Sequence, residues 1–123
     1  MSNRERVINF VQVAGFNTLS KMYHLYDTII KTQSKFCVEI GVFGGRTLLP
    51  MALACLENNG KIIGIDPWRS TEAAQPDLNV NTDIFDYYKI YIYLLLLIEK
   101  EKITNIKLIK STSQEAIDNF IDD

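Results

Sequence analysis

Short apolar runs alternate with segments of helical periodicity along most of the chain. Three runs of about five residues are rich in isoleucine, valine and leucine and predict strands, and the apolar spacing between them predicts helices. The expected strands are 36–40, 61–65 and 106–110, and the expected helices between them are 47–56 and 83–101. Such alternation predicts an α/β fold, a Rossmann-like parallel sheet with right-handed connections and helices on both faces.

The ends of the chain carry helix-start signals. Ser2 and Glu5 have the spacing of a capping box and open a first helix, which we expect to end at Gly15. A second helix follows, capped by Asn17 or Thr18. We therefore divide the chain into an N-terminal helical segment, 1–35, and a Rossmann-like domain, 36–123. Two overlapping capping boxes after residue 110 predict a last helix.

The segment 83–101 is apolar nearly all round as a helix. One stripe of its side chains can face the sheet (Phe85, Tyr88, Ile92 and Leu95), and a second stripe then needs another cover (Tyr87, Tyr91, Leu94 and Ile98). Its uninterrupted apolar run covers only 90–98, whereas a membrane-spanning helix needs about 20 residues. The run therefore predicts a buried or interface helix and no membrane span.

Composition narrows the class of protein. A chain of 123 residues with 47% hydrophobic and 23% charged residues predicts one globular domain. The net charge of −2 and the lack of a basic stripe argue against nucleic acid as a partner. No signal peptide is recognisable at the N-terminus, which predicts a cytoplasmic location. Cys37 and Cys55 are expected to be reduced, buried thiols. His24 is expected to be an ordinary half-exposed residue, and no metal-ligand spacing is present.

The most informative pattern is a glycine-rich turn between two acids. Glu39 lies near the end of the first predicted strand, the turn 41–45 follows, and the second strand delivers Asp66. In parallel sheets the carboxyl ends of strands form the ligand site, and an acid after the second strand can accept hydrogen bonds from ribose hydroxyls. Glu39 suits a ligand amino group and would repel a pyrophosphate, while the backbone N–H groups of 44–47 suit a carboxylate. The pattern favours an amino-acid nucleoside over a dinucleotide.

Less specific interpretations of the same residues stay open. Glu39 could be a strand-end carboxylate that faces solvent, and Asp66 followed by Pro67 could simply begin a turn. Trp68 could be no more than a hydrophobic cover for the loop that follows.

These residues resemble a known family. Val38-Glu39-Ile40-Gly41-Val42-Phe43-Gly44-Gly45-Arg46-Thr47 looks like the first motif of class I S-adenosylmethionine-dependent methyltransferases, and Ile63-Gly64-Ile65-Asp66-Pro67-Trp68 looks like the second. The segment 108–116 is similar to the one after their third strand. With the Asp-Pro-Trp step the chain looks most like the branch of small-molecule O-methyltransferases.

The resemblance implies S-adenosylmethionine as cofactor and a role for each matching residue. Glu39 and the turn backbone would hold the methionine part, Asp66 the ribose hydroxyls, and Trp68 would pack beside the adenosine. Thr112 or Ser113 would lie near the adenine edge. The full set of expected cofactor-binding residues is Glu39, Gly41, Val42, Phe43, Gly44, Gly45, Thr47, Asp66, Trp68, Thr112 and Ser113.

The sequence also differs from this family, whose sheet has seven strands. The sequence supplies equivalents of the first three, so it contains no candidate for the catalytic or acceptor-binding positions of later strands. We therefore expect no methyl transfer by this chain alone. The first strand would be an exposed edge, which invites a homo-oligomer or a partner chain. Two alternatives remain open: a non-catalytic remnant that acts as an oligomerising module, and a dinucleotide-binding α/β protein that binds NAD.

Overall fold

A computed structural model of the chain describes residues 1–69 and 86–121. Its centre is a three-stranded parallel sheet in the order β1-β2-β3. The strands are β1 (Phe36–Ile40), β2 (Lys61–Asp66) and β3 (Ile106–Lys110). All three expected strands are thus confirmed. Because β2 is central, β1 is an edge strand, and within the described residues it pairs only with β2.

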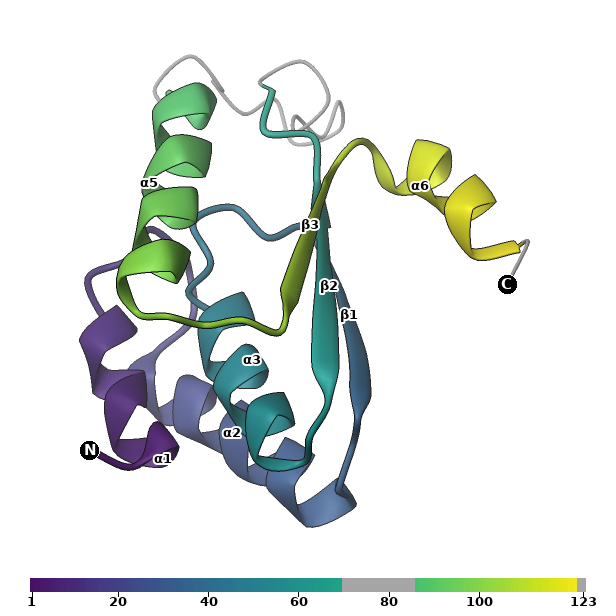
Figure 1. The fold of residues 1–123 in the computed structure, drawn as a ribbon. Helices are drawn as coiled ribbons and strands as arrows, with labels where there is room; N and C mark the ends of the chain where they lie inside the picture. The colour runs from purple at the N-terminus through teal and green to yellow at the C-terminus, as the bar shows by residue number, and fades with distance from the viewer. Residues whose placement is uncertain (70–85, 122–123) are drawn as a thin grey trace.

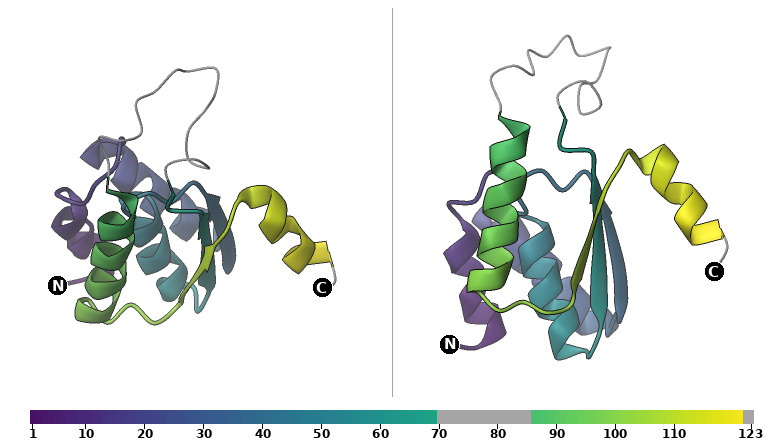
Figure 2. Two further views of the ribbon diagram at one scale, coloured as in Figure 1. Left: turned by 90° about the horizontal axis from the view of Figure 1, so that it is seen from above. Right: turned by 45° about the horizontal axis from the view of Figure 1, so that its top comes forward.

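Helices cover the two faces of this sheet unequally (Figures 1 and 2). Among the described residues, one face carries the helical elements that precede β3, and the other faces the last helix, α6 (Ser113–Ile121). The elements on the covered face are α1 (Asn3–Arg6), the 3₁₀ helix η1 (Val7–Phe10), α2 (Leu19–Thr32), α3 (Leu48–Glu57) and α5 (Tyr87–Lys100). The predicted α/β fold with helices on both faces is confirmed.

Three of the predicted capping residues act as expected. The hydroxyl groups of Ser2, Thr18 and Thr112 accept hydrogen bonds from backbone N–H groups three residues later. The first helix is shorter than predicted, since α1 ends at Arg6 and η1 ends at Phe10. Gly15 therefore does not end a helix, and its glycine is explained by a tertiary contact. A Cβ at this position would lie 2.5 Å from Cβ of Arg46, so only glycine permits the close approach of these two residues.

The predicted orientation of α5 is wrong. Leu94 is fully buried and Tyr91 packs against the core, whereas Tyr88 is 65% exposed and Leu95 is 38% exposed. The stripe of α5 that packs against the rest of the protein is therefore the second one, which contains Tyr91 and Leu94 and was expected to face away from the sheet. The reason is local packing, because Leu94 lies against Gly45 and the Tyr91 ring lies 4.5 Å from that of Trp68. Asp86 caps the helix at its start, and Phe85 lies outside the described residues.

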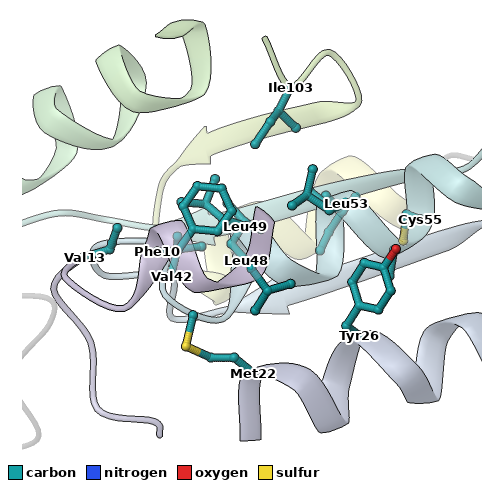
Figure 3. Close-up of a cluster of buried hydrophobic side chains, with 14 of the residues drawn as sticks. Phe10, Val13, Met22, Tyr26, Val42, Leu48, Leu49, Leu53, Cys55 and Ile103 are labelled. Carbon is teal, nitrogen blue, oxygen red and sulfur yellow. The ribbon is translucent and has the colours of Figure 1, made fainter. Parts of the chain in front are cut away.

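One hydrophobic core joins the N-terminal segment to the sheet (Figure 3). Phe10 of η1 and Met22 and Tyr26 of α2 pack in the same cluster as Leu49 and Leu53 of α3. The predicted segment 1–35 therefore shares its core with the sheet domain.

The two cysteines are free thiols whose Sγ atoms lie 3.4 Å apart. Burial raises the pKa of the Cys55 thiol to about 12, and Cys37 is only half-buried. Both are reduced, as expected, but only Cys55 is fully buried. None of the helices in the described ranges is long and apolar enough to cross a membrane.

Candidate functional site

The strand register places Glu39 on the helix-covered face of the sheet. Successive side chains of a strand point to opposite faces, so Cys37 and Glu39 face the helices and Val38 and Ile40 face the other way. Glu39 is paired in register with Gly64 of β2, and Asp66 lies two residues further along β2 on the same face. The two acids expected to act together are therefore neighbours at the carboxyl end of the sheet.

The carboxylate of Glu39 is buried without compensation. Neither Oε1 nor Oε2 has a hydrogen-bond partner among the described residues, and both atoms are inaccessible to solvent. Burial, and then the negative charge of Asp66, raises the pKa of Glu39 to about 8. Burying an unpaired polar group is costly, and residues with such perturbed pKa values concentrate at functional sites. The interpretation of Glu39 as a solvent-facing strand end is thus wrong.

A pocket of about 450 Å³ lies next to Glu39 at this end of the sheet. It contains five of the expected cofactor-binding residues, namely Glu39, Gly41, Val42, Phe43 and Thr47. The rest of its lining comes from the loop before α2, from α2 itself, from the end of β1 and from the residue after the glycine turn: Gly15, Phe16, Asn17, Lys21, Ile40 and Arg46. The β1–α3 turn therefore forms one wall of a cavity, and binding of a cofactor there stays a prediction.

The glycines of the turn divide into two kinds. Gly41 has φ +85°, and a Cβ there would meet nothing within 4 Å, so this glycine leaves the pocket side of the backbone open. Gly45 has φ +95°, and a Cβ there would lie 2.6 Å from Cδ1 of Leu94. Gly44 is packed against the backbone of Ala14 in the same way. The contacts of Gly44 and Gly45 are thus packing contacts, and Gly41 is the glycine that gives a ligand access.

Asp66 and Trp68 hold the glycine turn in place. Oδ2 of Asp66 accepts a hydrogen bond from the backbone N–H of Phe43 at 2.9 Å, and Oδ1 accepts one from the N–H of Trp68 at 2.7 Å. The indole Nε1 of Trp68 donates to the carbonyl oxygen of Phe43 at 2.7 Å. Asp66 does begin a turn, and Trp68, only 2% exposed, is part of the hydrophobic core, whereas the loop it was expected to cover lies outside the described residues. Each carboxylate oxygen of Asp66 keeps a second lone pair, so a ribose contact stays a prediction.

Thr112 and Ser113, which were expected near the adenine edge, lie away from this pocket. The Thr112 hydroxyl accepts from the N–H of Glu115 at the start of α6. Ser113 lines a separate pocket of about 510 Å³ on the other face of the sheet, together with Val38, Ile40 and Ile65. The structure therefore does not bring Thr112 and Ser113 together with Glu39, and their adenine contact stays a prediction.

Sequence reasoning missed the polar residues on the opposite wall of the pocket. The sequence pattern indicates Asn17 only as a helix cap and Arg46 only through its backbone N–H group in the motif, and it indicates no role for Lys21. A signal for Arg46 was present, because it directly follows the glycine pair at the start of a helix. Thr47 occupies the N-cap position of α3 without capping it, since its hydroxyl accepts from Nδ2 of Asn17 at 2.9 Å.

The polar side chains of this pocket suit an amino-acid nucleoside better than a metal ion. Within the ranges 1–69 and 86–121 no group of three histidine, cysteine or acidic side chains could hold a metal ion. The pocket offers instead a buried unpaired carboxylate, the attachment point that a ligand ammonium group requires.

Comparison with solved structures agrees with this architecture. The chain is similar to the SAH-bound methyltransferase PaMTH1 of Podospora anserina, with a TM-score of 0.66 and 11% sequence identity. The chain has a methyltransferase-like Rossmann fold. The match covers 97% of this chain and 45% of the other, so the chain spans less than half the length of that protein. Comparison of the sequence with protein-family models and with curated proteins gives no match.

Proposed function

We propose that this chain is the cofactor-binding half of an S-adenosylmethionine-dependent methyltransferase whose acceptor is a small molecule. The observation that carries the proposal is the buried carboxylate of Glu39, which lines the pocket beside Gly41 and lacks a hydrogen-bond partner among the described residues. The ammonium group of the methionine part would donate to both oxygens and would offset the cost of burying them.

The other residues of the site would position the nucleoside. Gly41 leaves room for the ligand to approach the backbone, and Asp66 fixes the turn through Phe43 and offers its free lone pairs to the ribose. The cofactor would supply the reactive methyl group. Excluding water and aligning an acceptor require a further wall over the pocket, and no residue of this chain is assigned to that task.

Binding of S-adenosylhomocysteine tests the proposal. Isothermal titration calorimetry should give saturable binding to the wild-type chain and at least tenfold weaker binding to Glu39→Gln, because a charge-assisted hydrogen bond is lost. Glu99→Gln is a matched control, since Glu99 is exposed on α5 and away from the pocket. Binding of NAD in place of S-adenosylhomocysteine would favour the dinucleotide alternative, in which no ligand ammonium group would pair with Glu39.

The exposed edge of the sheet favours a second role, that of an oligomerising module. Phe36, Val38 and Ile40 of β1 are 52%, 40% and 66% exposed and lie on one face of the edge strand. An unprotected apolar edge is a template for pairing with a second copy or another chain. Sedimentation at several concentrations should show association of the wild-type chain, and Val38→Lys should weaken it. An equally associated Val38→Lys variant would exclude this edge as the contact.

A further inference from the structure

Most of the unpartnered buried polar atoms lie in one place. Five such side-chain atoms are found in the described part of the chain, and four of them line the pocket at Glu39. These four are Oε1 and Oε2 of Glu39, Oδ1 of Asn17 and Nε of Arg46. The set combines acceptors with a cationic donor. A ligand that satisfies all of them must carry both donors and an acceptor, and the ionisable groups of Glu39 and Arg46 favour a cationic donor and an anionic acceptor.

Arg46 is positioned for this role by Gly15. The Arg46 side chain lies across Gly15, where a Cβ would be 2.5 Å from its Cβ and 2.9 Å from its Cδ. This contact directs the aliphatic part of Arg46 along the pocket wall and buries Nε. Arg46 forms no ion pair with Glu39 or with any other described acid. Its guanidinium group is therefore available to a ligand.

Lys21 adds a second positive charge on the same side. It lies on α2, is exposed, and lines the pocket together with Asn17 and Arg46. Asn17 is held by its own amide group, whose Nδ2 donates to the Thr47 hydroxyl, so Oδ1 is free to accept. The pocket thus has acceptors at Glu39 and Asn17 and cations at Arg46 and Lys21.

We propose that Arg46 and Lys21 bind the α-carboxylate of the ligand, and that Asn17 Oδ1 and Glu39 share its α-ammonium group. The site would then recognise both charges of an amino acid. This assignment rests on the proposed function, and it adds Arg46, Lys21 and Asn17 to the residues that select the ligand. It moves the carboxylate contact from the backbone N–H groups of the turn to side chains.

Decarboxylated S-adenosylmethionine is the probe, because it keeps the nucleoside, the sulfonium and the amino group and lacks only the carboxylate. By calorimetry the wild-type chain should bind S-adenosylmethionine at least tenfold more tightly than the decarboxylated compound. Arg46→Met, which keeps the apolar contact with Gly15, should bring this ratio close to one, and Arg46→Lys should restore part of it. Lys31→Met is the control, since Lys31 is exposed on α2 and does not line the pocket.

The possible failures are distinct. If the wild-type chain binds neither S-adenosylmethionine nor S-adenosylhomocysteine, the proposed function is overturned, and this assignment with it. If the wild-type chain binds S-adenosylmethionine and decarboxylated S-adenosylmethionine equally tightly, the proposed function stands and the carboxylate site is refuted. An unchanged ratio in a folded Arg46→Met variant would likewise refute it. Thermal unfolding of each variant by circular dichroism establishes that it is folded.

Discussion

Replacing Glu39 with glutamine should stabilise the protein at neutral and alkaline pH. Glutamine has nearly the shape of the protonated side chain and cannot ionise. The pKa of Glu39 is raised from 4.5 to about 8, mainly by burial. Between these two pH values the folded chain holds a proton that the unfolded chain releases, so the free energy of unfolding of the wild type falls as pH rises. Below pH 4.5 both states are protonated and the penalty vanishes.

The size of the effect follows from the pKa difference. Each pH unit in this window costs about 1.4 kcal/mol, and the full interval between 4.5 and about 8 sets a ceiling of roughly 5 kcal/mol. Relaxation of the protein and penetration of water around the ionised carboxylate lower this value, and we expect a gain of roughly 2–4 kcal/mol for Glu39→Gln at pH 8. Domains of this kind are stable by only about 5–15 kcal/mol, so the difference is easily measured.

The assay is urea unfolding followed by circular dichroism at several pH values between 4.5 and 9. Wild type and Glu39→Gln should be similar near pH 4.5 and diverge up to about pH 8, while the exposed control Glu99→Gln should follow the wild type. A difference that does not change with pH, or a Glu39→Gln variant that is less stable at pH 8, would refute the buried, unpaired carboxylate.

Two further predictions concern the glycine turn. Asp66→Ala removes the acceptors of two backbone N–H groups and should lower the free energy of unfolding by roughly 2–4 kcal/mol. It should also weaken S-adenosylhomocysteine binding about tenfold, because in the proposed function Asp66 both fixes the turn and accepts from the ribose. Unchanged denaturation and affinity would contradict this. Gly45→Ala should destabilise the chain by roughly 2–4 kcal/mol because the new Cβ would collide with Leu94. Gly41→Ala should cost only about 1–2 kcal/mol of backbone strain and should mainly reduce the affinity for the ligand. Urea unfolding and calorimetry of the two alanine variants distinguish these outcomes, and equal effects would argue against separate roles.

The strands and the site acids were predictable because they follow from local pattern. Apolar runs separated by helical spacing determine a parallel sheet, and the alternation along β1 places Glu39 opposite Gly64. The orientation of α5 was not predictable in this way. Its residues are apolar on every side, so the periodicity does not select a face, and the choice is made by the contacts of Leu94 with Gly45 and of Tyr91 with Trp68.

The opposite wall of the pocket could not be predicted from local pattern. Asn17, Lys21 and Arg46 are distributed over a loop, a helix and a turn, and they meet only because α2 packs against α3. Gly15 illustrates the limit, since it has the appearance of a helix end in the sequence and is instead a contact for Arg46. Motifs identified the first wall of the site, and tertiary packing supplies the second.

The central claim is that the Glu39 carboxylate binds the ammonium group of an S-adenosyl ligand. The number of protons released on binding tests this claim most directly. Calorimetric titration of S-adenosylhomocysteine at pH 7, repeated in buffers of different ionisation enthalpy, counts the protons released per ligand bound. Because the pKa of free Glu39 is about 8, the side chain is mostly protonated at pH 7 and must ionise to pair with the ammonium group. The account predicts release of close to one proton by the wild-type chain and of none by Glu39→Gln. Absence of binding, or the same proton release from both proteins, would contradict it.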